Sequence, residues 1–375
     1  MPELVVLTEQ LLAPVPGGTG RYTRELASAL AGTAPQGWSV TGVAARHRDP
    51  EPARVSGLGA ARALSLPRRA LTLAWEYGLP LWPGGDTVHA PTPLAPATPR
   101  RGKVLVVTVH DTVPFTHPET LTPRGAAWHR AVIRRAAQRA DALVVPTDSV
   151  AAELAEHAPG PAQVHVVGHG VPDVLRTAPP EDVVERVVRE LKLPSAYVLA
   201  VGTVEPRKGL DVLIAAMAGP EAPDLPLVTV GPMGWGGVDL RALAAQHGLP
   251  PGRLRALGQL TDAELSVVLH RATVLAAPSR AEGFGLPVLE AMAAGVPVVH
   301  SDAPALVEVA GGAGESAVRG DSADLARVLV SVIGSPERAA AMVDRGRARA
   351  ATFTWAHAAE SVWRLHLGLH AAKAG

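Results

Sequence analysis

The stretch Val274–Met292, VLAAPSRAEGFGLPVLEAM, contains the clearest strand, loop and helix signals in the 375-residue chain. Val274–Ala277 is a short apolar run typical of a buried strand. Pro287 suits the first turn of a helix and Gly295 suits the end of one, so we expect a helix over Pro287–Ala294. A strand, a glycine-rich loop and a helix in this order form part of a βαβ unit, which predicts a parallel α/β sheet.

Short apolar runs and helical patterns alternate along the rest of the chain as well. Val104–Val109, for example, is mostly β-branched and typical of a strand buried on both faces. We expect strands over Leu4–Thr8, Trp38–Ala44, Val104–Val109, Ala142–Val145, Val164–Val167, Tyr197–Val201, Leu227–Val230, Arg255–Leu257, Val274–Ala277 and Val296–His300. Helical patterns lie between most of these segments, which predicts two doubly wound, mostly parallel sheets.

The two sheets are expected to form two consecutive domains. Pro172–Pro180 is interrupted by prolines and is the expected linker, so the first domain covers residues 1–172 and the second covers residues 181–354. The segment 355–375 is predicted to form an amphipathic C-terminal helix. Its pattern allows the helix either to pack back on the first domain or to stay within the second.

The composition excludes several classes of site and partner. The chain has no cysteine, which excludes disulfides, Cys-ligated zinc, iron–sulfur clusters and thiol nucleophiles. Its 35 basic and 35 acidic residues cancel, which argues against a nucleic-acid-binding protein. The first residues carry no basic leader, and no stretch reaches the roughly 18 apolar residues of a membrane span. We therefore expect a cytoplasmic protein that contacts a membrane only peripherally.

Two segments of the first predicted domain interrupt the local structural preferences and are candidate sites. Gly17 and Gly18 lie in a glycine-rich turn before the first helix, where backbone amides can approach an anion. A tight turn without any ligand explains the same glycines. His110 and Asp111 follow a buried strand, and ligands of doubly wound sheets bind outside the carboxyl ends of the strands. A histidine at such a position is, however, often structural.

Two segments of the second predicted domain are also candidates. Arg207 and Lys208 follow Gly202 between a strand and a helix, where adjacent cations suit a diphosphate. A solvated charged turn is the ordinary alternative, but Lys208 is one of only four lysines beside 31 arginines. Glu282 and Glu290 bracket the start of the helix in the opening stretch, which indicates recognition of hydroxyl groups such as those of a sugar and a ribose.

Together these segments resemble the retaining glycosyltransferases of family 4, which have the GT-B fold and include bacterial mannosyltransferases. The similarity extends over essentially the whole chain, and EGFGLPVLEAM at 282–292 is its most specific part. GTVEPRK at 202–208 is similar to the mannosyltransferase-like branch, although many relatives have arginine in place of Thr203. The resemblance implies two Rossmann-like domains with a cleft between them, the first for the acceptor and the second for a nucleotide-sugar donor.

The resemblance also implies a role for each candidate residue. His110 would lie beside the transferring sugar, Arg207 and Lys208 would neutralise the departing diphosphate, and Glu282 would hold sugar hydroxyls. Gly18 would approach the diphosphate, Leu260 would flank the base and Glu290 would bind the ribose. The residues implied to bind the donor are Gly17, Gly18, Asp111, Gly202, Thr203, Leu260, Gly283, Phe284, Gly285, Leu286 and Glu290.

The implied reaction transfers a hexose with retention of configuration to a saccharide, lipid-linked or small-molecule acceptor, as in polysaccharide biosynthesis. Mannose from GDP-mannose is favoured, and UDP- and dTDP-sugars are alternatives. No cofactor is implied, and the absence of Asp-x-Asp indicates that the basic pair replaces a metal. The basic, apolar and aromatic segment 62–82 would suit a lipid-linked acceptor or the inner face of a membrane. A helix packed on its own sheet is the alternative for that segment.

Other functions fit the same architecture less well. A sugar-nucleotide epimerase would need a fuller set of acidic and histidine residues and would react without an acceptor. A non-catalytic sugar-nucleotide-binding protein would not need the cation pair. A nicotinamide-dependent dehydrogenase fits least, because the first turn lacks the complete G-x-G-x-x-G pattern.

Overall fold

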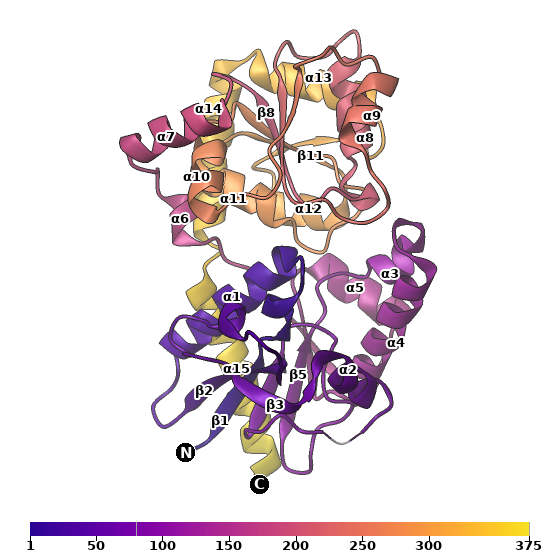
Figure 1. Cartoon of the computed structure of the whole chain (residues 1–375), viewed down its shortest axis with the longest axis vertical. Helices are drawn as coiled ribbons and strands as arrows, with labels where there is room; N and C mark the ends of the chain where they lie inside the picture. Colours follow the sequence, from indigo (N-terminus) through magenta and orange to yellow (C-terminus); the bar gives the residue numbers. More distant parts are fainter. Residues whose placement is uncertain (80, 375) are drawn as a thin grey trace. The chain divides into compact units, whose positions relative to one another are not determined.

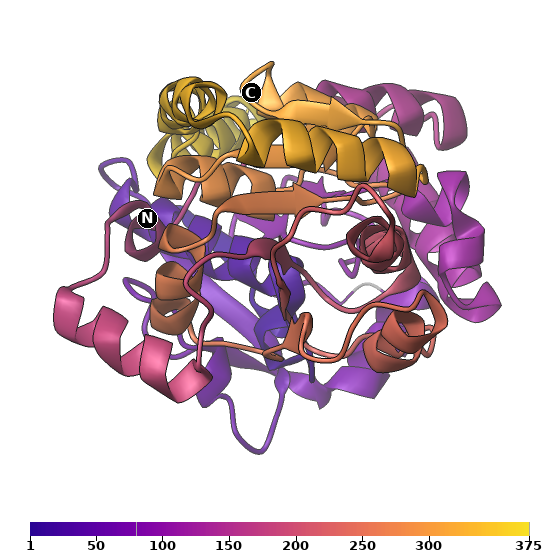
Figure 2. The same cartoon turned by 90° about the horizontal axis from the view of Figure 1, so that it is seen from above.

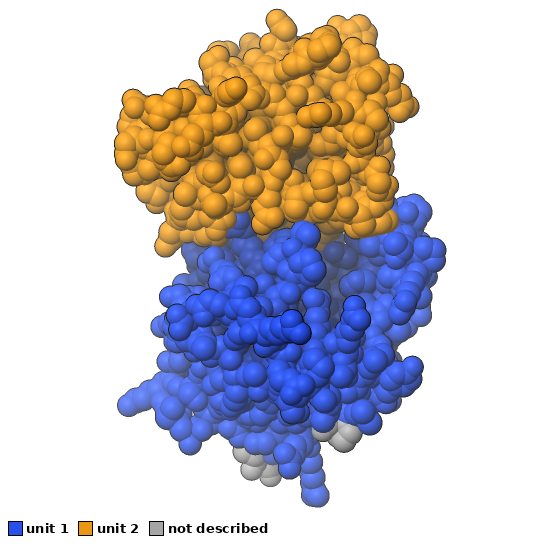
Figure 3. Space-filling view, in the orientation of Figure 1, with its two compact units in different colours: residues 1–170, 354–375 blue, residues 171–353 orange. Residues whose placement is uncertain are grey.

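The computed structural model of the protein describes residues 1–79 and 81–374 and contains two compact units. Unit 1 consists of residues 1–170 and the C-terminal residues from Thr354 onward, and unit 2 consists of residues 171–353 (Figure 3). Pro80, in the segment 62–82, and Gly375, at the end of the predicted C-terminal helix, lie outside the described residues.

Unit 1 contains a parallel sheet of seven strands in the order β3-β2-β1-β4-β5-β6-β7 (Figure 1). The strands are β1 (Glu3–Leu7), β2 (Ser39–Arg46), β3 (Arg62–Pro67), β4 (Thr87–Ala90), β5 (Val104–Thr108), β6 (Ala142–Val145) and β7 (Gln163–Val166). The helices are α1 (Gly17–Gly32), α2 (Arg68–Glu76), α3 (Val113–Thr116), α4 (Pro123–Arg139), α5 (Asp148–His157) and α15 (Trp355–Ala374). The central strands are fully buried, as Val5, Val88 and Val106 illustrate, because helices cover both faces of such a sheet.

Unit 2 contains a parallel sheet of six strands in the order β10-β9-β8-β11-β12-β13. The strands are β8 (Val198–Val201), β9 (Leu227–Val230), β10 (Leu254–Ala256), β11 (Val274–Ala277), β12 (Val298–Ser301) and β13 (Glu315–Ala317). The helices are α6 (Asp173–Arg176), α7 (Glu181–Leu191), α8 (Leu210–Ala218), α9 (Leu240–Gln246), α10 (Asp262–His270), α11 (Leu286–Ala294), α12 (Pro304–Ala310), α13 (Ser322–Ile333) and α14 (Pro336–Ala351). Figure 2 shows the same elements from above.

In both sheets the first strand of the unit lies near the middle, and the order of the strands reverses beside it. This point lies between β1 and β4 in unit 1 and between β8 and β11 in unit 2. The connections after such neighbouring strands run in opposite directions, which leaves a crevice at their carboxyl ends. The predicted fold class of two doubly wound parallel sheets is confirmed.

The C-terminal helix α15 belongs to unit 1 and packs against α1 (Figure 1). Trp363 is buried, and its indole N–H donates to the carbonyl oxygen of Leu30 at 3.0 Å. Near the end of the helix, Lys373 Nζ lies 2.6 Å from an Asp141 carboxylate oxygen and 2.6 Å from the carbonyl oxygen of Lys103. Apolar packing and an ion pair together attach the helix to this unit.

Several elements differ from the sequence predictions. Strands β3, β4 and β13 were not predicted. β4 contains the buried polar residues Thr87 and His89, and β3 and β13 are edge strands, of which β3 is largely exposed and β13 has only three residues. Helix α1 begins at Gly17, so the glycine-rich turn predicted to precede the first helix is instead its first turn. The segment 62–82, for which a helix was one of the two interpretations, contains strand β3 before helix α2.

Candidate active site

The candidate site of unit 2 lies where β8 and β11 end, at the point where the strand order reverses. These strands are hydrogen-bonded neighbours, so the loops 202–209 and 278–285 leave the same edge of the sheet. A small pocket lies at this edge. Its lining includes four of the predicted site residues, which are Gly202, Lys208, Glu282 and Gly285.

Three of the predicted residues form one ion-pair network. Glu282 accepts hydrogen bonds from Lys208 Nζ at 2.6 Å and from Arg207 Nη1 at 2.7 Å, one on each carboxylate oxygen. Ser279 Oγ donates to the same oxygen as Lys208, at 2.7 Å. Arg207 also reaches the Glu205 carboxylate, at 2.7 Å through Nη2 and 3.1 Å through Nε. The two cations are therefore each paired with carboxylates, and they do not form an unpaired positive site.

The Glu282 carboxylate is ionised throughout the physiological pH range. Its side chain is only 10% exposed, and this burial would by itself raise its pKa. The charges of Lys208 and Arg207, with the hydrogen bonds from Lys208 and Ser279, outweigh the burial and lower the pKa to about 2. Such charge-assisted bonds are strong, so the network holds these side chains in one arrangement.

Arg280, which the sequence interpretation did not single out, connects the two loops. Its guanidinium forms a bidentate salt bridge with the Asp211 carboxylate, with N···O distances of 2.8 and 2.6 Å. Arg280 Nη1 also donates to the carbonyl oxygen of Pro206 at 2.8 Å. Its backbone N–H donates to the carbonyl oxygen of Arg207 at 2.8 Å. Burial tends to raise the pKa of Asp211, but the Arg280 pair lowers it overall. No sequence pattern links these two residues, which are 69 positions apart.

Two glycines allow the backbone to come this close. Gly209 has a φ of 64°, and a Cβ at this position would lie 2.2 Å from the carbonyl oxygen of Pro278. Gly285, just before α11, has a φ of 93°, and its Cβ would lie 2.3 Å from the Leu306 side chain. Both conformations favour glycine, so the glycine-rich character of the loops has a steric cause.

The other predicted donor-binding residues of unit 2 lie in different environments. Phe284 is 5% exposed and packs edge-on against Phe353, with ring centroids 5.7 Å apart, so its side chain belongs to the core. Glu290 is 3% exposed on α11, and Leu260 packs half-buried on the same core. Thr203 and Leu286 are half-buried and Gly283 is buried.

The predicted residues of unit 1 lie after the central strands of its sheet. Gly17 and Gly18 are exposed in the first turn of α1, and His110 and Asp111 follow β5. His110 Nε2 lies 2.8 Å from the carbonyl oxygen of Pro91, so Nε2 donates and Nδ1 of the neutral ring is an acceptor. Burial lowers the pKa of His110, although the Pro91 bond and the Asp111 charge act in the opposite direction.

A buried polar chain that the sequence interpretation missed lies beside His110. Tyr22 packs edge-on against the His110 ring, with centroids 4.7 Å apart. Tyr22 Oη is 3.0 Å from Thr108 Oγ1, and that oxygen is 3.2 Å from His89 Nε2. His89 Nδ1 is in turn 3.2 Å from His366 Nε2 on α15. Burial, helped by His110, lowers the pKa of His89 to about 3, so this ring stays neutral. The C-terminal helix thereby takes part in the surroundings of His110.

Across residues 1–79 and 81–374, no group of three or more His, Asp or Glu side chains is placed to hold a metal ion. Over the same residues, every helix is too short or too polar to cross a bilayer.

Two protein-family models match the chain. The model described as Glycosyltransferase Family 4 matches residues 16–174, and the model described as Glycosyl transferases group 1 matches residues 184–349. Together they cover most of the chain, and the second includes every residue that lines the pocket of unit 2.

The chain is also similar to curated proteins. It is 38% identical over 163 residues to O-antigen chain mannosyltransferase B of Escherichia coli, which is 42% of this chain and 42% of that protein. It is 34% identical over 276 residues to the MMP alpha-(1->4)-mannosyltransferase of Mycolicibacterium hassiacum, 68% of this chain and 63% of the relative. It is 34% identical over 232 residues to the D-inositol 3-phosphate glycosyltransferase of Mycobacterium avium, 60% and 54% of the two chains. The chain thus matches roughly half the length of these relatives.

Solved structures share the fold over nearly the whole chain. Sucrose-phosphate synthase from Thermosynechococcus elongatus has a TM-score of 0.77 at 22% identity, covering 99% of this chain and 100% of that one. HepE of Anabaena in complex with UDP-glucose has a TM-score of 0.75 at 18% identity, covering 97% and 99%. At this identity the likeness establishes the fold alone.

Proposed function

Because the chain belongs to the group 1 glycosyltransferases of family 4 and has the GT-B fold, we propose that it is a retaining glycosyltransferase that moves a hexose from a nucleoside-diphosphate sugar to an acceptor. The observation that supports this most directly is the network of Arg207, Lys208 and Glu282 beside the pocket at the strand reversal of unit 2. These residues offer cationic donors for a diphosphate and a carboxylate acceptor for sugar hydroxyls.

In this proposal the two cations act on the leaving group. As the bond to the sugar breaks, negative charge grows on the diphosphate and the sugar becomes oxocarbenium-like. Fixed donors that face this charge bind the transition state more tightly than the ground state and so accelerate the step. A lysine ammonium carries three N–H donors, so Lys208 can bind Glu282 and a diphosphate together, while Arg207, which gives four of its five donors to Glu205, Glu282 and the Ala281 carbonyl, contributes mainly its positive charge. A metal ion is then not required.

The remaining roles in the proposal come from the family resemblance. Glu282 and the backbone amides of residues 283–286 hold the sugar, Glu290 binds the ribose, and Leu260 flanks the base. His110 and the Gly17–Gly18 turn of unit 1 contact the donor, and unit 1 also binds the acceptor. No secure nucleophile is available, so we favour a same-face route in which the leaving phosphate takes the proton from the acceptor hydroxyl.

Mannose from GDP-mannose is the donor that we favour, because two of the relatives described above are mannosyltransferases. The inositol 3-phosphate glycosyltransferase and the UDP-glucose complex keep other sugar nucleotides as alternatives. We propose a saccharide, lipid-linked or small-molecule acceptor in polysaccharide biosynthesis. The expected location is the cytoplasm, with peripheral contact at the inner face of the membrane.

A panel of sugar nucleotides incubated with the purified protein tests the proposal. We expect release of one nucleoside diphosphate, thermal stabilisation by GDP in preference to UDP, and activity that survives EDTA. Activity that EDTA abolishes and Mg²⁺ or Mn²⁺ restores would contradict the metal-free role of the cations. An epimerase would convert the sugar nucleotide without an acceptor, and a binding protein would be stabilised without any turnover.

A further inference from the structure

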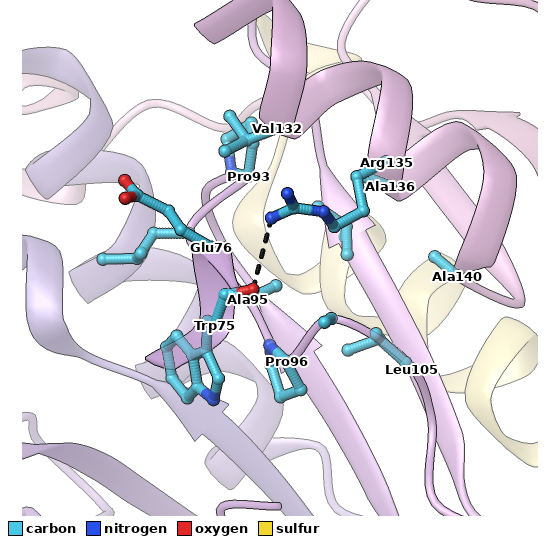
Figure 4. Close-up of a pocket in the computed structure, with 13 residues that line it drawn as sticks. Trp75, Glu76, Pro93, Ala95, Pro96, Leu105, Val132, Arg135, Ala136 and Ala140 are labelled. Carbon is cyan, nitrogen blue, oxygen red and sulfur yellow. Dashed lines mark hydrogen bonds between the residues drawn. The ribbon is translucent and has the colours of Figure 1, made fainter. Parts of the chain in front are cut away.

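The two faces of strand β5 in unit 1 differ in character. Leu105 and Val107 pack towards α2 and α4. Figure 4 shows this side of the sheet, where a hollow beside Leu105 has room for about one water molecule. Because side chains alternate along a strand, Val104, Val106 and Thr108 face the opposite side, towards α1 and α15. Thr108 is a polar residue on this second face, and it is fully buried.

Hydrogen bonds join Thr108 to α1 on one side and to α15 on the other. Thr108 Oγ1 lies 3.0 Å from Tyr22 Oη of α1 and 3.2 Å from Nε2 of His89 in β4. The chain continues from His89 Nδ1 to Nε2 of His366 in α15, at 3.2 Å. All four residues are at most 2% exposed. Buried polar groups are costly unless they are hydrogen-bonded, and a bonded chain of this kind holds its members in one arrangement.

The groups of this chain are uncharged. Burial lowers the pKa of His89 to about 3, and it lowers the pKa of His366 well below its usual range. A neutral imidazole has one nitrogen that donates and one that accepts, so His89 can bond to Thr108 on one side and to His366 on the other. Burial also raises the pKa of Tyr22, which therefore keeps its hydroxyl proton. The Tyr22 hydroxyl is thus connected to α15 through neutral hydrogen bonds.

The ring of Tyr22 forms one wall around His110. The two rings meet edge to face, with centroids 4.7 Å apart and 85° between their planes. The centroid of the His169 ring is 5.8 Å from that of His110, so Tyr22 is the closer neighbour. Tyr22 also packs against Trp355, at the start of α15, with centroids 5.9 Å apart. Because His110 Nε2 donates to the carbonyl oxygen of Pro91, the ring is held at one edge by this bond and along its side by Tyr22.

We propose that Tyr22 is a positioning residue whose ring fixes the orientation of the His110 imidazole. The Tyr22 hydroxyl is held in turn by the chain through Thr108 and His89 to His366, so α15 takes part in the positioning. This inference rests on the proposed function in one step, the contact between His110 and the transferring sugar. An imidazole that is fixed before the donor binds needs no reorganisation in the transition state. Core packing alone would require only the aromatic ring, since apolar replacements of a whole buried polar chain can be nearly neutral for stability.

NMR spectra of the full-length protein labelled with ¹⁵N-histidine report on His110 without any substrate. Long-range ¹H–¹⁵N spectra distinguish the two nitrogens of each imidazole, and His110→Gln identifies the His110 signals among those of the 14 histidines. In the native protein we expect one set of His110 signals, with the proton on Nε2. Tyr22→Leu, which removes the ring, should shift or split these signals.

Two milder variants test the anchor of Tyr22 in the same spectra. Tyr22→Phe keeps the ring and removes its hydroxyl, and His366→Leu breaks the far end of the chain. Both should broaden or split the His110 signals, because the Tyr22 ring is then held less firmly. His366→Gln, whose side-chain amide can replace the imidazole Nε2, should restore the single set.

Steady-state kinetics test whether the orientation of His110 matters for transfer. Tyr22→Phe and His366→Leu should each lower kcat roughly tenfold and leave KM for the sugar nucleotide within about twofold, because displacing a catalytic group by about 1 Å can cost as much as a hundredfold. His366→Gln should recover most of the native kcat.

The matched control is Tyr197→Phe, which removes the hydroxyl of another buried tyrosine. Tyr197 Oη donates to the carbonyl oxygen of Val268 at 2.7 Å in the core of unit 2, and neither residue belongs to the proposed site. This variant should lose stability to urea much as Tyr22→Phe does, and it should leave the His110 signals and kcat unchanged. The comparison separates positioning of His110 from a general loss of stability.

Two results would overturn the proposal. One is a set of His110 signals that remains as in the native protein in Tyr22→Leu or, if that variant does not fold, in both Tyr22→Phe and His366→Leu. The other is a change in kcat in Tyr22→Phe and His366→Leu that is no larger than in Tyr197→Phe. If the native protein transfers no sugar at all, the proposed function fails, and the spectra alone still decide whether Tyr22 positions His110.

Discussion

Replacing Glu282 by glutamine removes one charge from the centre of the unit 2 site while keeping the size of the side chain. In the native protein its carboxylate accepts hydrogen bonds from Lys208, Arg207 and Ser279 at 2.6–2.7 Å. The lowering of its pKa from 4.5 to about 2 means that the folded surroundings favour the ionised form by about 3 kcal/mol. We therefore expect Glu282→Gln to reduce the free energy of unfolding at pH 7 by about 2–3 kcal/mol.

The pH dependence of this effect has a definite sign. The pKa of Glu282 is lower in the folded protein than in the unfolded chain, so its stabilisation is fully present above about pH 4.5 and is lost as the pH falls towards 2. The difference in unfolding free energy between the native protein and Glu282→Gln should shrink over the same range. Urea unfolding at a series of pH values measures both curves.

Glu282→Gln should also affect the affinities for two ligands differently, namely the intact sugar nucleotide and the free nucleoside diphosphate. Glu282 is proposed to bind sugar hydroxyls, so Glu282→Gln should weaken the intact sugar nucleotide by roughly tenfold or more, the loss of one charged hydrogen bond. The free nucleoside diphosphate should bind unchanged or more tightly, because Lys208 and Arg207 lose a competing carboxylate. Isothermal titration with both ligands gives the comparison.

Glu205→Gln is the matched control for this experiment. Glu205 pairs with the same Arg207 as Glu282 does, but it does not line the pocket. This control should leave the ratio of the two affinities as in the native protein. If Glu282→Gln instead weakens both ligands equally, the carboxylate does not recognise the sugar. A stability change within about 0.5 kcal/mol, typical of ordinary surface positions, would contradict the argument from the ion-pair network.

Three further substitutions test the surrounding loops. Lys208→Ala should lower kcat and kcat/KM by the equivalent of roughly 2.7–4 kcal/mol, as expected for a donor to growing negative charge. It should also weaken binding of both the sugar nucleotide and the nucleoside diphosphate. A rise in KM alone in steady-state kinetics would contradict this role. Arg280→Lys should change the free energy of unfolding by less than about 1 kcal/mol, because the Arg280–Asp211 pair is partly exposed. It should nevertheless lower kcat/KM roughly tenfold to a hundredfold, because Arg207 and Lys208 are then held less firmly. Unchanged kinetics would show that the Arg280–Asp211 pair does not position these cations. Gly209→Ala should destabilise the protein by more than Gly237→Ala in urea unfolding, because both have a φ near 65° but only the first places a Cβ against backbone; equal effects would refute the steric argument.

Much of the fold could be predicted from the sequence, because buried parallel strands appear as continuous apolar runs. Ala142–Val145, Leu227–Val230 and Val274–Ala277 were predicted with the boundaries of β6, β9 and β11. Strand β4 could not be recognised, although it lies in the centre of its sheet, because two of its four residues are Thr87 and His89. Both are fully buried, and His89 belongs to the polar chain that continues to α15.

The candidate site could be predicted only as separate segments. Gly202, Lys208 and Glu282 were singled out by residue type and by position after strands, and the structure brings them to one pocket. The reason they meet is the strand order: β8 and β11 are neighbours in the sheet, although α8, β9, α9, β10 and α10 lie between them in the chain. Local patterns carry no information about which distant strands pair, so the ion-pair network itself was not predictable.

The structure changes how the cation pair is understood. From the sequence, Arg207 and Lys208 were predicted to bind a diphosphate, and Glu282 was predicted to bind hydroxyl groups separately. In the structure all three belong to one network in which Glu205 also takes part, so the site is preorganised by its own carboxylates. A diphosphate that binds there contacts N–H donors that are already oriented. Unconstrained cations would instead lose side-chain entropy on binding. Preorganisation of this kind is what makes fixed charges effective against charge that develops only in the transition state.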